Sequence, residues 1–214
     1  MPIDRFNPYL CQLCTKELPQ YHRSLCPRCG KPQSLFSQHC LGCQQLKPHW
    51  HRLVIARPYT LEIRYLIQQF KFANQPQIGL LLAQLLGRHL NDSINTIDLP
   101  ECLVCMPLHT KRLRERGYNQ AFIIAKALAK QLNIPLLPAA EFVRIRHTQA
   151  QSQQNKITRK TNVLGAFKLN KPIVYKHVAL IDDVVTTGQT ANQASLTLLN
   201  GGVKRVDVWC IARA

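Results

Sequence analysis

Two neighbouring carboxylates precede a run of small hydroxyl-bearing residues in the segment VALIDDVVTTGQT, residues 178–190. Carboxylates such as Asp182 and Asp183 accept hydrogen bonds from the diol of a sugar and bind Mg²⁺. A loop of small residues at the start of a helix offers backbone N–H groups to a phosphate. The combination therefore favours a ligand that carries both a phosphate and vicinal hydroxyls, with hydroxyls or Mg²⁺ between the acids and the phosphate.

The elements around this segment predict an α/β fold with a mostly parallel sheet flanked by helices. The apolar run HVALI, residues 177–181, is typical of a strand covered on both faces, and it delivers the two acids to the carboxyl edge of the sheet, where such sheets bind ligands. A helix is expected from about Thr190, and another that Asn119 caps. The other expected strands are 51–59, 101–109, 203–214 and a short one within 134–143, and the other expected helices are 60–72 and 78–90.

Six of the nine cysteines lie in the first 50 residues as three CxxC pairs. Two such pairs complete a tetrahedral structural zinc site, and in a chain without a secretory signal this is favoured over disulfides or a redox dithiol. The most compact set is Cys26, Cys29, Cys40 and Cys43. Cys11 and Cys14 are then a half-site that His22 or His39 completes, or they form the alternative site with Cys26 and Cys29. We expect a small zinc-knuckle domain over residues 1–50 and an α/β domain over 51–214.

A fourth CxxC pair lies in a predicted strand. Residues three apart on a strand point to opposite faces, so Cys102 and Cys105 cannot share a metal ion. We expect these two side chains, and that of Cys210, to be core thiols.

The net charge of +17 and the isoelectric point near 9.9 indicate a polyanionic partner, either a phosphorylated substrate or a nucleic acid. Residues 144–163 are basic and rich in glutamine, which predicts a long mobile loop. No apolar run approaches the roughly 18 residues of a membrane span, and the N-terminus is not a secretory signal. These features predict a cytoplasmic protein without a membrane partner.

The segment 178–190 resembles the signature with which type I phosphoribosyltransferases bind phosphoribosyl diphosphate (PRPP): four apolar residues, two acids, two variable residues, then Thr/Ser-x-Gly-x-Thr. Over nearly its whole length the chain is similar to the ComF/GntX family, which joins zinc knuckles to such a domain. The matching segments are MPLHTKRLRERGYNQA, residues 106–121, and RIRHTQAQSQQNKITRKTNVLGAF, residues 144–167. Longer members carry four N-terminal CxxC pairs, and the first is missing here.

The resemblance implies a role for each part of the site. Asp182 and Asp183 are expected to hold the ribose diol and Mg²⁺. The turn after residues 102–106, from Pro107 to His109, is expected to meet pyrophosphate, and the basic loop 144–163 to close over the ligand. The residues expected to bind the 5′-phosphate are Thr186, Thr187, Gly188, Gln189 and Thr190. Those expected near pyrophosphate are Pro107, Leu108, His109, Arg112 and Arg116, with Arg114 also considered. The loop arginines assigned to catalysis are Arg146 and Arg159.

Two functions remain open at this point. One is a Mg²⁺-dependent phosphoribosyltransferase whose acceptor the sequence does not identify. The other is a non-catalytic protein of DNA uptake and natural transformation that binds single-stranded DNA on the same scaffold. The resemblance also implies a DNA-translocating competence ATPase or helicase and recombination proteins as partners.

Overall fold

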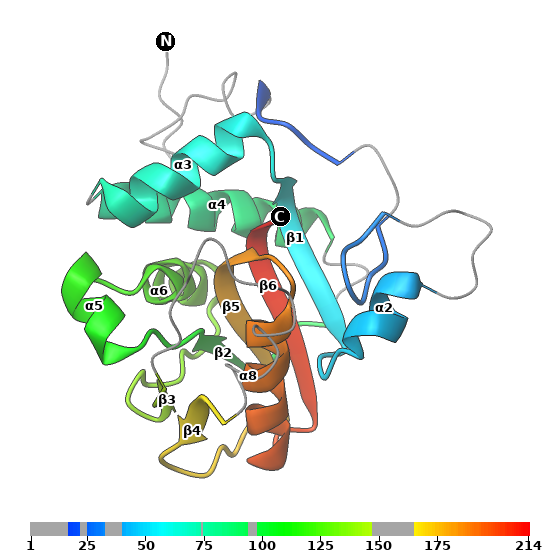
Figure 1. Ribbon diagram of the computed structural model, residues 1–214, viewed down its shortest axis with the longest axis vertical. Helices are drawn as coiled ribbons and strands as arrows, with labels where there is room; N and C mark the ends of the chain where they lie inside the picture. Colours follow the sequence, from blue (N-terminus) through cyan, green and yellow to red (C-terminus); the bar gives the residue numbers. More distant parts are fainter. Residues whose placement is uncertain (1–16, 22–24, 33–39, 74, 94–97, 147–164) are drawn as a thin grey trace.

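Four parallel strands form the central sheet of the computed structural model (Figure 1). The structure describes residues 17–21, 25–32, 40–73, 75–93, 98–146 and 165–214. The strand order is β1-β6-β5-β2, and every neighbouring pair is parallel. The four strands are β1 Arg52–Pro58, β2 Cys102–Cys105, β5 His177–Val185 and β6 Arg205–Arg213. The predicted α/β class with a parallel sheet is confirmed.

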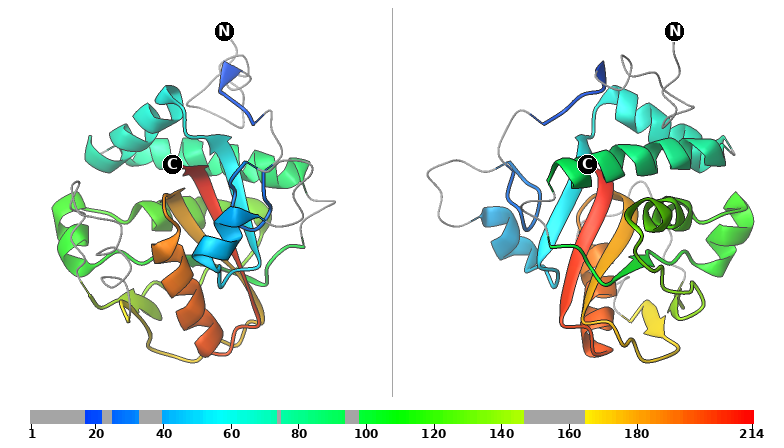
Figure 2. Two further views of the ribbon diagram at one scale, coloured as in Figure 1. Left: turned by 45° about the vertical axis from the view of Figure 1, so that its right-hand side comes forward. Right: turned by 180° about the vertical axis from the view of Figure 1, so that it is seen from behind.

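Helices cover both faces of this sheet, which explains why β5 and β6 are apolar on both sides. Helix α8, Gln189–Asn200, packs on one face, whereas α4, Pro76–Asp92, and α6, Gln120–Leu132, pack on the other (Figure 2). Helix α3, Leu61–Phe72, packs against α4. Within the described ranges, no helix is both long and apolar enough to cross a bilayer.

The ends of the helices follow the local signals of the sequence. Asn119 is the N-cap of α6, as predicted, and its side-chain oxygen accepts a hydrogen bond from the Phe122 N–H at 3.4 Å. Helix α8 begins one residue before the predicted Thr190, and Gly201 is its C-cap.

Three features differ from the sequence prediction. Strand β5 continues past the predicted end at residue 181, through both aspartates, because β6 pairs with it as far as Val185↔Arg213. The strand predicted within 134–143 is reduced to a single bridge between Leu136 and Leu103, followed by β3, Phe142–Arg144. Three short elements were not predicted: α2 Leu41–Leu46, α5 Thr110–Arg116 and β4 Phe167–Leu169. Of the predicted loop 144–163, residues 147–163 lie outside the described residues.

The thiols of Cys102, Cys105 and Cys210 are buried in the core, as expected. Burial raises the pKa of Cys102 and of Cys105 to about 11, so both thiols stay protonated at neutral pH. These cysteines are therefore packing residues.

A buried carboxylate joins β5 and β6 at the amino end of the sheet. The Asp207 side chain is fully buried and lies 3.1 Å from His177 Nε2 and 3.2 Å from an Arg205 guanidinium nitrogen. Burial opposes ionisation of Asp207, but the hydrogen bonds with His177 and Arg205 outweigh it and hold the pKa of Asp207 below its usual range. The ionised carboxylate therefore stabilises the first residues of two central strands.

We expect Asp207→Asn to lower the free energy of unfolding at pH 7 by about 2 kcal/mol, since a charge-assisted hydrogen bond contributes roughly 1.5–3 kcal/mol. The folded-state pKa is depressed, so this stabilisation is present above the ordinary aspartate pKa and is lost as pH falls through the folded-state value. Urea unfolding at pH 7 and at successively lower pH measures both effects. A difference between wild type and variant that does not shrink in acid contradicts this account. Asp98→Asn, which removes an exposed partner of Arg205, is the control and should change stability little.

Candidate functional site

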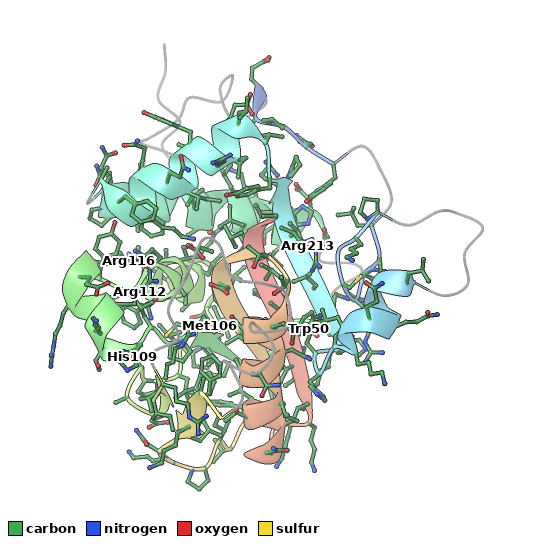
Figure 3. All side chains as sticks on the ribbon, viewed as in Figure 1. Trp50, Met106, His109, Arg112, Arg116 and Arg213 are labelled. Atoms are coloured by element: carbon green, nitrogen blue, oxygen red, sulfur yellow. The ribbon has the colours of Figure 1, made fainter. Side chains whose placement is uncertain are left out.

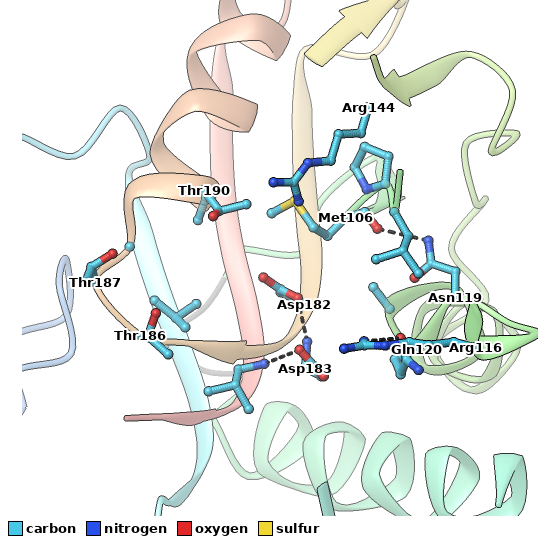
Figure 4. Close-up of a pocket in the computed structure, with 17 residues that line it drawn as sticks. Met106, Arg116, Asn119, Gln120, Arg144, Asp182, Asp183, Thr186, Thr187 and Thr190 are labelled. Atoms are coloured by element: carbon cyan, nitrogen blue, oxygen red, sulfur yellow. Dashed lines mark hydrogen bonds between the residues drawn. The ribbon is translucent and has the colours of Figure 1, made fainter. Parts of the chain in front are cut away.

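One pocket at the carboxyl edge of the sheet contains both aspartates and the loop that follows them (Figure 4). Its walls come from the end of β5, the start of α8, the turn after β2, the end of α5, the start of α6 and the end of β3. The polar and charged residues that line it are Arg116, Asn119, Gln120, Arg144, Asp182, Asp183, Thr186, Thr187 and Thr190.

The backbone holds one oxygen of each carboxylate. Asp182 Oδ1 accepts a hydrogen bond from the Asp183 N–H at 2.9 Å, and Asp183 Oδ1 accepts one from the Val184 N–H at 2.7 Å. Asp183 Oδ2 forms an ion pair with Lys71 Nζ, also at 2.7 Å. Arg144 and Arg116 approach the acid pair from two different sides of the pocket (Figure 4).

These contacts make the two aspartates electrostatically different. Burial, and then the neighbouring Asp183 carboxylate, raise the pKa of Asp182 well above its ordinary value. Burial also opposes ionisation of Asp183, but the Lys71 ammonium overcomes it and lowers the pKa of Asp183. The protein therefore stabilises the ionised form of Asp183 better than that of Asp182. A cation or a hydroxyl donor that enters the pocket beside Asp182 would stabilise its carboxylate.

The loop after β5 ends at a helix N-terminus that can hold an anion. Thr186 and Thr187 are exposed, and Gly188 has a positive φ of 81°. The N-cap residue Gly188 has no side chain to cap α8, and the Thr187 hydroxyl accepts a long hydrogen bond, 3.5 Å, from the Gln189 N–H. The other N–H groups of the first turn and the positive end of the helix dipole are directed at this loop. The hydroxyls and these N–H groups lie on one side of the pocket, where they can donate hydrogen bonds to an anion.

The segment that contains α2 supports the back of this loop. A Cβ added to Gly188 would lie 2.9 Å from a methyl carbon of Leu46 and 3.1 Å from the Trp50 ring. Asn192 in α8 accepts a hydrogen bond from the His49 N–H at 2.6 Å, and its amide donates to the carbonyls of Leu46 and Lys47 at 3.4 Å. The position of the loop therefore depends on the cysteine-containing segment.

The structure places the expected pyrophosphate residues in different surroundings. Pro107 and Leu108 line the pocket, as does Arg116, which donates to Gln120 Oε1 at 3.2 Å. His109 does not line it, because it is the N-cap of α5 and accepts a hydrogen bond from a backbone N–H. Arg112 lies outside the lining, on α5 with Arg116 (Figure 3).

Two more predicted residues, Gln189 and Arg146, fall outside the pocket lining. Gln189 faces a second groove on the other side of the Thr186–Thr187 turn. Arg146 is exposed just beyond β3, and Arg159 lies outside the described residues.

Sequence reasoning missed two cations of the site, Lys71 and Arg144. Arg144 belongs to the basic stretch but was not among the residues expected in the site. Its position two residues before Arg146, at the end of a short strand, could have indicated it. Lys71 had no local signal, because its partner Asp183 is more than 100 residues away in the chain.

The second groove is larger than the pocket and has a different character. It lies between the cysteine-containing segment, the carboxyl ends of β1 and β6, and the outer side of the Thr186–Thr187 turn. Tyr21 and Tyr59 contribute aromatic rings to it, and Lys31 and Arg213 contribute positive charge.

Four thiols come together beside β1. The sulfurs of Cys26, Cys29, Cys40 and Cys43 all lie within 4.8 Å of one another. Cys29 Sγ and Cys40 Sγ are 3.3 Å apart, and Cys26 Sγ and Cys43 Sγ are 3.6 Å apart. A zinc ion with four thiolates at 2.3 Å requires sulfur separations of about 3.8 Å. The cluster is consistent with a zinc ribbon, whereas Cys11 and Cys14 lie outside the described residues.

The surroundings of the cluster favour a thiolate at Cys40, whereas burial raises the pKa of Cys29 and of Cys43. The thiol of Cys40 is partly desolvated, yet N–H groups of Cys43 and Gly42 and the neighbouring thiols lower its pKa to about 7. A Cβ on Gly42 would come within 3.0 Å of Cys29 Sγ, so only glycine fits beside this sulfur. The donor set leaves no position for a substrate, so a bound zinc ion would be structural.

We expect Cys29→Ser and Cys40→Ser to reduce bound zinc from about one ion per chain to nearly none, because each removes one of four ligands. Cys102→Ser, which changes a buried core thiol, should keep the zinc, as should the double variant Cys11→Ser/Cys14→Ser. Metal analysis by mass spectrometry after extensive dialysis gives the stoichiometry. Loss of zinc in the Cys11/Cys14 variant would show that the alternative set of ligands is the correct one.

No protein-family model matches the chain. Two solved structures show a distant likeness in fold. One is glutamine PRPP amidotransferase from B. subtilis, with a TM-score of 0.44 and 15% identity, covering 67% of this chain and 30% of that one. The other is a purine phosphoribosyltransferase from Pyrococcus horikoshii, with a TM-score of 0.36 and 12% identity, covering 76% of this chain and 86% of that one.

Characterised sequences resemble the chain along its full length. Competence protein F of Haemophilus influenzae is 37% identical over 96% of this chain and 90% of its own length. DNA utilization protein YhgH of Escherichia coli K12 is 33% identical over 100% of this chain and 94% of its own length. Competence protein ComFC of Bacillus subtilis is 26% identical over 90% of this chain and 79% of its own length. The chain therefore belongs to the ComF/YhgH (GntX) family.

Proposed function

We propose that the pocket binds PRPP together with Mg²⁺ and that the protein transfers or senses the phosphoribosyl group. The observation that carries this proposal is that an acid pair and an anion-binding loop line one pocket whose remaining walls bear two arginines. The 5′-phosphate would lie on the Thr186–Thr190 loop and the ribose diol beside Asp182. The diphosphate would then extend toward Pro107 and Arg116.

The residues of the pocket fit a magnesium ion. Mg²⁺ prefers oxygen ligands and is commonly held by one or two carboxylates plus substrate phosphates, and Asp182 and Asp183 supply such oxygens. The bound ion would neutralise charge on the diphosphate leaving group.

The chain's own residues would stabilise the leaving group, orient the ribose and exclude water. Cleavage of the bond at C1 of the ribose produces an oxocarbenium-like centre and a highly charged leaving group. Arg116 and Arg144 would stabilise the negative charge that develops on the diphosphate. The acid pair would hold the ribose hydroxyls and so fix the orientation of C1. Arg144 lies at the start of the expected closing loop 144–163, which would exclude water from the pocket; Arg146 and Arg159 remain candidates only as part of that loop.

The names of the relatives suggest the biological setting. They are competence and DNA utilization proteins, so we place the proposed PRPP chemistry in the uptake or use of DNA. An ATPase or helicase of DNA uptake and recombination proteins are the partners that this setting implies.

We expect Asp182→Asn/Asp183→Asn to weaken PRPP binding in the presence of Mg²⁺ by at least about 100-fold, because both the carboxylate contacts and the metal ligands are lost. Isothermal titration calorimetry measures the affinity, and release of pyrophosphate with a panel of nucleobase and amine acceptors measures turnover. Asp92→Asn/Asp98→Asn removes two exposed acids and changes the net charge equally, so it should bind PRPP like wild type. Retained PRPP affinity in the Asp182/Asp183 variant would refute the assignment.

The second groove supports a second function, the binding of single-stranded nucleic acid. Aromatic rings beside cations form stacking platforms along which a strand can run, and Tyr21, Tyr59, Lys31 and Arg213 provide both groups. The net charge of +17 adds a long-range attraction for phosphates. This function needs no catalysis and is compatible with PRPP binding on the other side of the Thr186–Thr187 turn.

For this second function we expect single-stranded DNA affinity to fall steeply with salt, with a slope of about −0.7 for each phosphate contacted. Tyr59→Ala should weaken binding about tenfold without changing the slope, because it removes stacking only. Lys31→Gln should make the slope shallower by about 0.7. Fluorescence anisotropy with a labelled oligonucleotide at several salt concentrations measures both quantities. A slope near zero in wild type would exclude the groove as a binding site for the strand.

A further inference from the structure

Lys71 is a cation of the site that is contributed by a distant helix. It lies in the last turn of α3, and its Nζ atom is 2.7 Å from Asp183 Oδ2. The side chains of both residues are mostly buried, with 22% of Lys71 and 11% of Asp183 exposed. The ammonium group therefore contacts one of the two carboxylates on which the proposed ligand site is built.

Three contacts fix the end of α3 against the last residue of α5 and the segment that follows it. The rings of Phe70 and Tyr118 stack with centroids 5.6 Å apart, and the Tyr118 hydroxyl donates to the Phe70 carbonyl. The guanidinium of Arg116 lies over the Phe72 ring at 5.5 Å. Lys71 stands between these two anchored aromatic residues, so its backbone is held in place while its long side chain can move.

The position of the ammonium group conflicts with that of a metal ion on the same oxygen. Mg²⁺ binds carboxylate oxygens at 2.0–2.1 Å, and two cations on one oxygen repel each other strongly in a buried site. Metal binding to Asp183 Oδ2 therefore requires the ammonium to leave. A ligand that brings negative charge next to this oxygen gives the ammonium a new partner when it leaves.

We propose that Lys71 is a substrate-contacting residue that occupies the cation position on Asp183 until Mg²⁺–PRPP enters, and then moves to an anionic oxygen of the diphosphate. This inference rests on the proposed function, because it takes PRPP as the ligand. The anchoring of α3 to Arg116, the arginine on the diphosphate side of the pocket, places Lys71 on that same side.

The proposed movement of Lys71 affects the binding of free Mg²⁺ and of Mg²⁺–PRPP differently. The free metal ion brings no anion to receive the ammonium, so it must displace Lys71 from Asp183 at full cost. The metal bound to PRPP supplies that anion. The wild-type protein should therefore bind free Mg²⁺ weakly and Mg²⁺–PRPP tightly. Lys71 should lower the affinity for the free ion and raise the affinity for Mg²⁺–PRPP.

Lys71→Met tests this inference because Met keeps much of the apolar stem and removes the charge. We expect the variant to bind free Mn²⁺, a paramagnetic substitute for Mg²⁺, about tenfold more tightly, because no ammonium has to leave Asp183. We expect it to bind Mg²⁺–PRPP about tenfold more weakly, because the lost ammonium–diphosphate contact, worth up to about 100-fold, exceeds that tenfold gain. Electron paramagnetic resonance measures free Mn²⁺ in the first titration, and calorimetry gives the PRPP affinity in the second. Arg64→Met removes an exposed cation from the same helix and should leave both affinities unchanged.

The opposite signs of the two shifts separate the possible outcomes. If both affinities fall in Lys71→Met, the lysine only maintains the structure of the site, and if neither changes it has no role; each result overturns the inference. If wild type itself fails to bind Mg²⁺–PRPP, the proposed function is wrong, whereas the Mn²⁺ titration still decides whether Lys71 excludes a metal ion from Asp183.

Discussion

The confinement of two adjacent carboxylates at the end of a central strand is the constraint on which the arrangement of this site depends. Removing ionised carboxylates from water is costly unless cations or hydrogen-bond donors compensate them. Lys71 and Arg116 approach the pair from α3 and α5, and Arg144 from β3. Each of these segments is distant from β5 in the chain, so the electrostatic demand of Asp182 and Asp183 is met only when the tertiary structure is complete. Folding and assembly of the site are in this sense one event.

The anion-binding loop has a separate support on its other side. Leu46 and Trp50 leave no room for a side chain at Gly188, and Asn192 ties α8 to the segment between them. The same segment follows Cys43 directly and is joined to the other cysteine pair, because Trp50 donates to the Arg28 carbonyl at 2.5 Å. A zinc ion that fixes the cysteines would therefore also fix the back of the loop.

Local sequence was sufficient for the features that local physics determines. The apolar runs, the Asn119 cap and the CxxC spacing are properties of neighbouring residues, and the corresponding strands, the helix start and the four-thiol cluster follow them. Features that depend on contacts between distant segments were not predictable in this way. The extension of β5 depends on its pairing with β6, and the ion pair of Lys71 depends on how α3 is anchored. His109 was expected to contact the ligand, but it caps α5, a helix too short to be recognised in the sequence.

The two sides of the Thr186–Thr187 turn differ in charge and would suit different anions. On the groove side, the exposed side chains of Lys31 and Tyr59 lie in a lining that contains no Asp or Glu side chain, so a bare phosphate chain with exposed bases would suit it. On the pocket side, the same phosphate would meet Asp182 and Asp183 and be repelled unless it brought hydroxyls or a metal ion with it. A phosphorylated sugar with a bound cation satisfies that condition, and a polynucleotide backbone alone does not. In the proposed function the acid pair would therefore act as a selectivity element in a strongly basic protein, because it would reserve the pocket for a ligand of mixed charge.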